Sequence, residues 1–197
     1  MNKETILKKT FYLDSDIILL SKLLLGKVIE TNIDNKKTSA IIVETEAYAG
    51  IQDKASHSYQ NKKTIRNQNM FKEGGIAYIY LCYGMHSLFN VVTNLKNHPQ
   101  AILIRAVEPI KGIHHMEKRR NQKISYNLTS GPGKLTQALG IQLKDNGSLL
   151  KGPLILIKDI GININQIKSS PRIGVSYAKD DALKPWRFRI KDNKWCS

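Results

Sequence analysis

Apolar and polar residues alternate in short runs along this chain of 197 residues, and the period of the runs changes from segment to segment. Alternation over about four to eight residues predicts a strand, whereas apolar residues three and four apart predict a helix. The pattern predicts strands over residues 27–33, 38–48, 76–83, 87–93, 101–107, 153–157, 172–177 and 186–190. It predicts helices over residues 17–25, 112–121 and 131–139. Because several strands follow one another as hairpins, we expect a mixed α/β (α+β) fold with a curved, mainly antiparallel sheet flanked by helices.

Capping and breaking residues mark the boundaries of these elements. Asp14–Asp16 supplies N-cap candidates for the first helix, and Gly26 is expected to end it. Glu108-Pro109 is expected to end the strand before it. Residues 49–71 are polar and predict a long surface loop, a kind of segment that tends to be functional. Because no linker interrupts the chain, we expect residues 1–197 to form one domain.

The chain is strongly basic, with 31 Lys and Arg against 16 Asp and Glu, a net charge of +15 and a pI near 9.8. Residues 1–50 contain equal numbers of basic and acidic side chains, so the whole excess of positive charge lies after residue 50. No acidic residue occurs between Glu73 and Glu108. Such a balance favours a polyanionic partner such as nucleic acid. A solvated basic surface, in a protein from an AT-rich genome, is the alternative interpretation.

The cysteines and the apolar segments place the protein in a reducing, aqueous compartment. Cys82 and Cys196 are too few for a disulfide framework and lack the spacing of a zinc site. The start of the sequence shows no signal peptide. The apolar stretch 17–25 is too short for a membrane span and contains Lys22. We therefore expect a cytoplasmic protein without a metal.

One candidate site lies in the second predicted strand, within Val43-Glu44-Thr45-Glu46-Ala47-Tyr48. Residues two apart on a strand share a face, about 7 Å from each other, so Glu44, Glu46 and Tyr48 would line one surface. An exposed strand face is the simpler interpretation. However, the apolar run before them looks buried, and they border the most basic part of the chain. Because phosphates repel a carboxylate, we infer a chemical role such as water activation, for which either glutamate could serve.

A second candidate is aromatic and comprises Tyr78, Tyr80 and Tyr83 in the predicted strand 76–83. Alternation places Tyr78 and Tyr80 on one face. Tyr83 directly precedes Gly84, so we expect it to protrude at a hairpin tip. Tyrosines in strands usually pack half-buried. Beside a basic surface they can also stack on bases, and one can insert between base pairs.

Two basic motifs complete the set of candidates. Ser130-Gly131-Pro132-Gly133-Lys134 resembles a phosphate-binding helix start, with its serine as N-cap and its lysine in the first turn. It is not a Walker A loop, because Leu128 and Leu135 stand where that motif needs Gly and Ser or Thr. Lys118-Arg119-Arg120 is a polyanion footprint or a solvated helix face. Together the candidates fit an enzyme that flips a nucleotide out of DNA and exposes its sugar–base bond to water.

Long, ordered motifs extend from about residue 9 to the end of the sequence. They are VETEAY at 43–48, Asp53 with Ala55-Ser56-His57-Ser58, Thr64-Ile65-Arg66-Asn67 followed by Met70-Phe71, YIYLCYGMHSLFNVV at 78–92, LIRAVEP at 103–109 and SGPGKLTQALGI at 130–141. They resemble the mammalian-type alkyladenine (3-methyladenine) DNA glycosylases, a family also found in many bacteria. The resemblance implies a monofunctional glycosylase that acts on damaged purines in duplex DNA.

The resemblance also implies roles for single residues. Glu46 matches the base that deprotonates the attacking water, and Arg105 matches an arginine that helps to hold that water. Ile173 matches a position whose backbone carbonyl also holds it. Tyr83 matches the wedge that fills the space vacated in the duplex, and Asn90 matches a residue that rejects guanine's exocyclic amine. The pocket around the flipped base is expected to comprise Tyr48, His57, Tyr80 and Asn90. Contacts to the DNA backbone are expected from Thr64, Arg66, His86 and Lys134.

The chain departs from the family pattern in three places. His86 stands where vertebrate members carry a second aromatic residue beside the wedge. The segment between Asn90 and Arg105 looks about two residues longer than in the mammalian proteins, which could shift the register of the returning strand. The long N-terminal extension of vertebrate members is absent, so no additional partner-binding module is expected.

Two alternatives to the monofunctional glycosylase have distinct signatures. A bifunctional glycosylase/lyase would use a lysine nucleophile, for which Lys134 is the candidate, although no neighbouring group is seen to activate it. A non-catalytic DNA-damage or architectural DNA-binding protein would use the basic surface and Tyr83 but not Glu46. For the favoured function we expect double-stranded DNA with damaged purines as the partner. We expect no cofactor, no metal, no membrane and no obligate protein partner, and a monomer in the cytoplasm of a bacterium, associated with the nucleoid.

Overall fold

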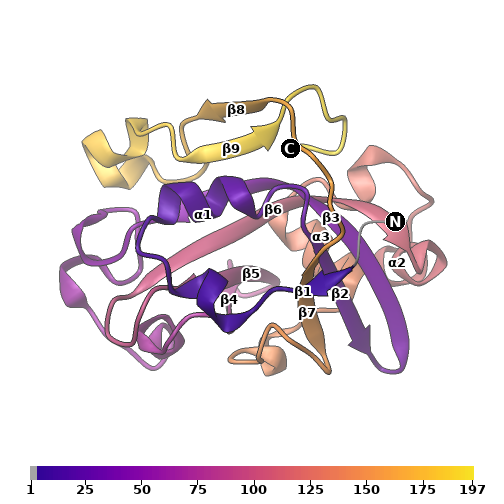
Figure 1. The fold of residues 1–197 in the computed structure, drawn as a ribbon, viewed down its shortest axis with the longest axis horizontal. Coiled ribbons are helices and arrows are strands. Elements are labelled where there is room, and N and C mark those ends of the chain that lie inside the picture. The colour runs from indigo at the N-terminus through magenta and orange to yellow at the C-terminus, as the bar shows by residue number, and fades with distance from the viewer. Residues whose placement is uncertain (1–3) are drawn as a thin grey trace.

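A nine-stranded antiparallel sheet organises the chain, as the computed structural model of residues 4–197 shows (Figure 1). The strands are β1 (Thr5–Ile6), β2 (Val28–Ile33), β3 (Lys36–Tyr48), β4 (Ala77–Cys82), β5 (His86–Thr93), β6 (Gln100–Lys111), β7 (Ile155–Asp159), β8 (Ile167–Ser170) and β9 (Arg187–Ile190). Their order is β1-β7-β2-β3-β6-β5-β4, and β9 pairs with both β3 and β8. The expected α+β architecture with a mainly antiparallel sheet is therefore confirmed.

Three α-helices and several short 3-10 helices cover this sheet. The α-helices are α1 (Ile17–Leu23), α2 (Ile113–Arg120) and α3 (Pro132–Leu139). The 3-10 helices are η1 (Lys9–Leu13), η2 (Gly50–Gln52), η3 (Tyr59–Asn61), η4 (Gln68–Phe71), η5 (Tyr126–Leu128), η6 (Leu143–Asp145) and η7 (Ser176–Leu183). In the view of Figure 1, α1 lies between the β8–β9 hairpin and the β4–β5 hairpin, above β6. Asp16 caps α1 by accepting a hydrogen bond from the Leu19 amide at 2.9 Å, as its position predicts.

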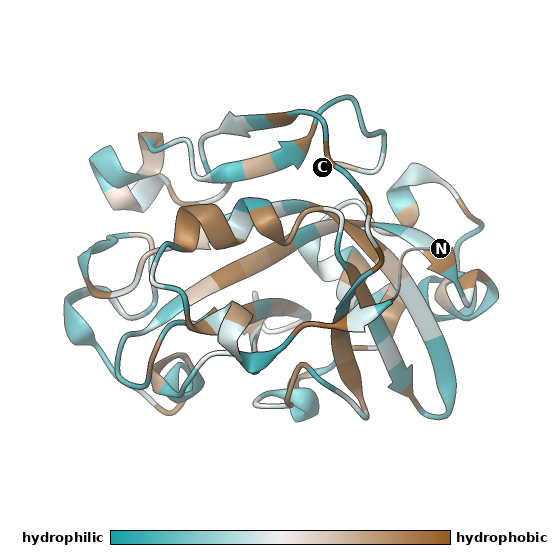
Figure 2. Ribbon diagram, viewed as in Figure 1, coloured by the Kyte–Doolittle hydropathy of each residue, from teal (hydrophilic) through white to brown (hydrophobic). Residues whose placement is uncertain are grey.

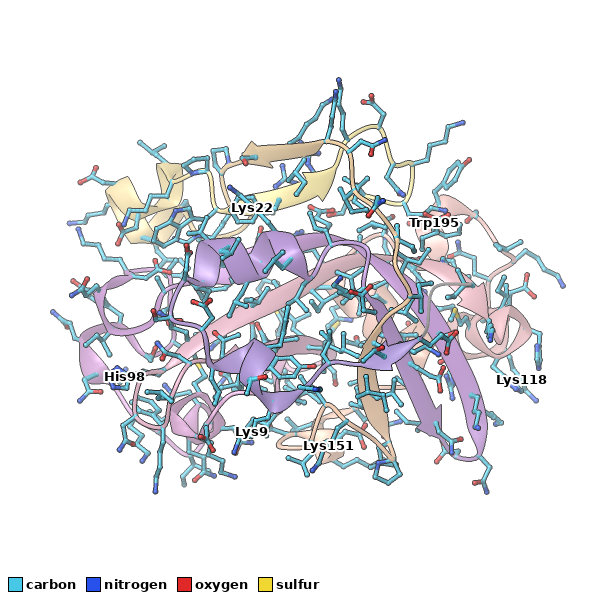
Figure 3. The ribbon with its side chains drawn as sticks, in the orientation of Figure 1. Lys9, Lys22, His98, Lys118, Lys151 and Trp195 are labelled. Carbon is cyan, nitrogen blue, oxygen red and sulfur yellow. The ribbon has the colours of Figure 1, made fainter. Side chains whose placement is uncertain are left out.

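The core lies where α1 and α3 pack on the central strands. Ile42, Ile79, Phe89, Ile102 and Ile104 are completely or almost completely buried there. Hydrophobic residues concentrate on α1 and on the middle of β6 and β7, while the outer loops are polar (Figure 2). Burial of this apolar surface is the main force that holds the sheet together. Polar side chains point outward around the perimeter, as Lys9, His98, Lys118 and Lys151 illustrate (Figure 3).

Irregularities in β3 and β6 position the candidate site. The register passes from Ile42–Val107 to Glu44–Ala106 and then to Thr45–Ile104. Val43 on β3 and Arg105 on β6 are therefore left out of the pairing, each as the extra residue of a bulge. Bulges redirect side chains and are common beside active sites. These bulges lie at the two carboxylates of β3, where β9 also joins that strand.

Three details of the predicted secondary structure are wrong. The predicted strand 172–177 is a loop leading into η7, and the strand that pairs with β9 is β8. Pro171, which lacks an amide donor, follows directly on β8, and Gly174 has a φ of +75°, so extended pairing cannot continue. β6 does not end at Glu108-Pro109 but continues to Lys111, because Pro109 lies at a bulge opposite Ala40.

The third correction concerns helix α3, whose N-cap is Gly131 rather than Ser130. Gly131 adopts a φ of +125°, and Pro132 occupies the first helical position. In addition, residues 49–71 form an irregular segment as expected, and residues 60–66 in its middle are exposed as a surface loop would be. Parts of the segment on either side are buried, with side chains that include Asp53, Ala55, Ser58, Asn69 and Met70. The segment is therefore a surface loop whose flanking parts pack into the interior.

Candidate active site

A cavity of about 230 Å³ lies between the central strands, the 49–71 segment and the loop that follows β8. Seven of the predicted site residues line it: Tyr48, His57, Tyr80, Tyr83, Asn90, Arg105 and Ile173. Tyr78, which the resemblance left without a role, lines it as well. An apolar cavity of about 150 Å³ accepts benzene. This cavity therefore has room for a larger planar ring system.

Glu46 lies directly behind the wall of this cavity and is completely buried. Its carboxylate accepts a hydrogen bond from the Tyr48 hydroxyl at 2.8 Å and another from the Ile173 amide at 2.8 Å. Arg105 Nη1 lies 3.4 Å from Glu46 Oε1. All three partners line the cavity. The interpretation of Glu44 and Glu46 as residues on a solvent-exposed face is therefore wrong, because both side chains are fully buried.

Ile173 contacts Glu46 through its amide, a contact that the sequence did not predict. The expected contribution of its backbone carbonyl to water binding stays a prediction. The amide is brought to Glu46 by a buried ion pair between Arg172 and Asp53. Arg172 Nη2 and Asp53 Oδ1 are 2.8 Å apart, and Arg172 Nη1 also donates to the Ala47 carbonyl at 2.9 Å. Arg172 also lies over the Tyr48 ring at 4.9 Å, so this ion pair supports two walls of the site.

Aromatic side chains form the opposite wall. The rings of Tyr78 and Tyr80 lie 5.5 Å apart, on one face as expected, and His57 meets Tyr80 edge-on at 4.7 Å. His57 Nδ1 and the Tyr78 hydroxyl form a hydrogen bond of 2.8 Å. Burial, together with the positive charge of Arg66, lowers the pKa of His57 to about 4, so the ring is neutral at pH 7. Burial also raises the pKa of Tyr48, and the neighbouring Glu46 raises it further.

Asn90 lies in the floor of the cavity and is 3% exposed. Its amide nitrogen donates to the Tyr78 carbonyl at 3.1 Å. Because that donor is held by the backbone of β4, the orientation of the amide group in the cavity is fixed. Asn90 pairs with both Tyr78 on β4 and Leu103 on β6, so regular sheet pairing sets its position.

Tyr83 stands at the tip of the β4–β5 hairpin and is 90% exposed. It adopts a φ of +50° and is followed by Gly84 at +70°, a conformation that turns the chain tightly. Met85, beside it, is 71% exposed. Two large side chains are thus exposed at the tip of this hairpin, and Tyr83 also lines the cavity, although burial of both would be favourable.

The residues expected to contact the DNA backbone are spread around this site. Arg66 lies 5.0 Å from the Tyr80 ring and donates to the Leu81 carbonyl at 3.0 Å. His86 is exposed and packs against Gly133 at the start of α3. Thr64 is hydrogen-bonded to Asn67 within its own turn. Lys134 donates to Asn127 and is not among the residues that line the cavity.

Within residues 4–197, no group of three or more His, Cys, Asp or Glu side chains is arranged to hold a metal ion. None of the helices in the same part of the chain has the length and apolar character needed to cross a membrane.

Comparison with known proteins gives a consistent result. The family described as Methylpurine-DNA glycosylase (MPG) matches residues 10–194. A protein of Chlamydia felis is 48% identical over 190 residues, covering 95% of this chain and 97% of the relative. Proteins of Desulfitobacterium hafniense (42% identical, 97% and 98% covered) and Bacillus cereus (43% identical, 95% and 97% covered) are also similar. All three are provisionally named 3-methyladenine DNA glycosylases.

Proposed function

Because the chain belongs to the methylpurine-DNA glycosylase family, we propose that it removes alkylated or deaminated purines from duplex DNA. The proposed substrates are of the 3-methyladenine, 7-methylguanine and hypoxanthine class. The damaged nucleotide is flipped into the cavity, and water activated by Glu46 hydrolyses the N-glycosidic bond, which leaves an abasic site. One observation carries this proposal: the buried carboxylate of Glu46 lies directly behind an aromatic cavity of nucleobase dimensions, beside Arg105, which lines that cavity.

The carboxylate fits the charge that develops during glycosidic bond cleavage. Alkylation at N3 or N7 makes the purine cationic and a good leaving group, and the departing sugar becomes oxocarbenium-like. Glu46 would take the proton of the attacking water and provide a negative counter-charge to this cation. Arg105, whose Nη1 lies 3.4 Å from Glu46, would hold the water and the sugar-phosphate beside it. The hydrogen bonds from Tyr48 and Ile173 fix the orientation of the carboxylate.

The walls of the cavity suit a cationic base. Electron-rich tyrosine faces attract cations by about 0.5–2 kcal/mol. The lowered pKa of His57 keeps that ring neutral, so it does not repel a positively charged purine. Tyr78 and Tyr80 form one continuous aromatic surface beside it. The cavity therefore supports discrimination by charge as well as by shape.

We propose that Tyr83 is the wedge that replaces the flipped nucleotide in the duplex. Tyr83→Ala is expected to weaken binding to a lesion-containing duplex about 5- to 100-fold, because stacking on a base contributes about 1–3 kcal/mol. Equilibrium titration with fluorescent duplex measures the change. Tyr126→Ala is a suitable control, because this tyrosine is also exposed but belongs to η5 and is not among the residues that line the cavity. Equal affinities of Tyr83→Ala and the unaltered protein would remove Tyr83 from this role.

Asn90 is proposed to exclude bases with an exocyclic amine at the position it faces. Asn90→Ser is expected to increase release of undamaged or N7-alkylated guanine relative to adenine lesions about tenfold, because a clash is removed from the cavity floor. Chromatography of the bases released from methylated DNA gives the ratio. A ratio that stays the same would show that selectivity is set elsewhere.

A single-turnover assay tests the function as a whole. One duplex carries a single hypoxanthine, and a second is treated to form 3-methyladenine. We expect free base before any alkali and strand breaks only after alkali. Strand breaks without alkali, with a borohydride-trapped adduct lost in Lys134→Ala, would indicate the lyase mechanism instead. Lesion binding without any base release would indicate a damage-recognition protein.

The same proposal extends to the partner and the setting. We propose double-stranded DNA with damaged purines as the partner and a monomer as the acting species, without an added cofactor or an obligate protein partner. The cytoplasm of a bacterium, with the nucleoid as the place of action, fits the bacterial relatives. The net charge of +15 supports attraction to the phosphates of DNA, whatever the base sequence.

A further inference from the structure

A second carboxylate, Glu44, lies in the same buried cluster and has no part in the steps described above. It precedes Glu46 by two residues on β3 and is completely buried. It accepts hydrogen bonds from the Ser197 amide at 2.6 Å, from the Ser197 hydroxyl at 2.9 Å and from Arg187 Nη1 at 3.1 Å. Burying an ionised carboxylate is costly unless it is paired and hydrogen-bonded. The three donors satisfy that requirement and leave Glu44 as a fixed negative charge.

Arg105 is shared between the two carboxylates without being bound closely by either. Its Nε lies 3.5 Å from Glu44 Oε1, and its Nη1 lies 3.4 Å from Glu46 Oε1. Charge-assisted hydrogen bonds between such groups normally measure about 2.7–2.9 Å. Within residues 4–197, Arg105 Nε has no hydrogen-bond partner although it is buried. The Arg105 guanidinium thus lies between the carboxylates of Glu44 and Glu46 and forms a short ion pair with neither.

We propose that Glu44 is a positioning residue that keeps Arg105 from closing onto Glu46. The inference rests on the proposed function, because it concerns the same reaction. Without the charge of Glu44, Arg105 would move to Glu46 and form a short, bidentate ion pair. A carboxylate paired in this way is a weaker base, and the arginine would no longer have free donors for the water or the phosphate. Glu44 acts through Arg105 and does not itself contact the reacting atoms.

The segment 193–197 supplies two of the three donors and is fastened to the sheet at several points. Asn193 donates to Glu108 at 2.8 Å, and the Cys196 thiol contacts the Val43 carbonyl at 3.5 Å. Trp195 packs edge-on against Tyr126 with ring centroids 5.3 Å apart, and Figure 3 shows it beside the end of β9. Ser197 is therefore held next to β3 by contacts outside the cluster. Removing the Ser197 hydroxyl would take away one hydrogen bond to Glu44 and leave its carboxylate in place, which is a smaller change than replacing Glu44.

The test is the pH dependence of single-turnover base release in Glu44→Gln and Ser197→Ala. For Glu44→Gln we expect a plateau rate about tenfold lower and an acid-side midpoint lower by about one pH unit, because a negative neighbour is lost. For Ser197→Ala we expect a smaller midpoint shift in the opposite direction, because Glu44 then attracts Arg105 more strongly. Glu30→Gln is the matched control, since Glu30 lies on β2 and pairs with Lys158 at 3.0 Å.

Two outcomes overturn the inference. One is loss of thermal stability and of rate in both variants with unchanged midpoints, which is what a purely structural role would produce. The other is a crystal structure of Glu44→Gln in which Arg105 Nη1 stays at 3.4 Å from Glu46 rather than closing to below about 3.0 Å. The structural measurement does not need activity. If the unaltered protein releases no base, the proposed function fails, and the position of Arg105 still decides the inference. If Glu44→Gln does not fold, Ser197→Ala is measured instead: we expect Arg105 Nε to lie closer to Glu44 than 3.5 Å, and an unchanged distance with an unchanged midpoint overturns the inference.

Discussion

Replacing Glu46 by glutamine is expected to slow single-turnover base release about a thousandfold or more, while lesion binding stays within a few-fold of the unaltered protein. A general base contributes about 10²–10⁴-fold, and the negative charge opposite the developing cation adds to this. Glutamine has nearly the same shape and keeps an oxygen that can accept the hydrogen bond from the Ile173 amide, which measures 2.8 Å in this structure. It cannot take the proton of water.

The measurement compares base release and binding on the same hypoxanthine duplex. Glu30→Gln provides a control for loss of a paired strand glutamate, because Lys158 lies 3.0 Å from it and neither residue lines the cavity. Normal base release by Glu46→Gln would remove Glu46 from the reaction. Joint loss of binding and release would instead indicate that the substitution disturbs the fold, and unfolding curves would show this directly.

Asp53→Asn is expected to lower the free energy of unfolding by about 3–5 kcal/mol, the largest stability effect that we expect in this chain. Asp53 and Arg172 are 1% and 5% exposed, and their carboxylate and guanidinium meet in two hydrogen bonds of 2.5 and 2.8 Å. The asparagine variant would leave the arginine charge buried with one partner fewer. Because Arg172 precedes Ile173 and lies over the Tyr48 ring, the hydrogen bonds that Tyr48 and Ile173 donate to Glu46 should weaken as well.

Urea unfolding followed by fluorescence or circular dichroism measures this effect as a change in midpoint at constant slope. Asp192→Asn is the control, since Asp192 forms an exposed ion pair with Lys168 at 3.2 Å. Exposed pairs contribute little to stability. Equal midpoints for the two variants would mean that the Asp53–Arg172 pair is dispensable to the fold.

Much of the sheet could be predicted because hydrophobic alternation is a local signal. The hairpin from β2 to β3 and the hairpin from β4 to β5 follow from alternation and turn residues alone. Residues 172–177 alternate in the same way, but Pro171 and Gly174 prevent pairing, and Arg172 is directed to Asp53 instead. Pro109 shows the opposite case: proline normally ends a strand, but a bulge accommodates this one within β6.

The site could be predicted in part for the same physical reason. Motifs identified the residues that surround the cavity, because those residues lie in short contiguous stretches. Alternation alone could not separate Glu44 from Glu46, since both lie on β3 and both are buried. The two carboxylates differ in contacts that come from distant parts of the chain: the Ile173 amide donates to Glu46, whereas the Ser197 amide donates to Glu44. The Asp53–Arg172 pair spans 119 positions and leaves no local signal.

The attachment of residues 187–197 to β3 has a consequence for the order in which the protein matures. Glu44 and its Ser197 donors are separated by 153 positions, and contacts of such long range form late because closing long loops costs entropy. Ribosomes add about 5–20 residues per second, so the β4–β5 hairpin emerges several seconds before β9. A nascent chain therefore has the hairpin that would engage DNA before it has the finished cluster that would cleave it. We expect cleavage to begin only when the last strand has docked, so that truncated products of translation carry no excision activity.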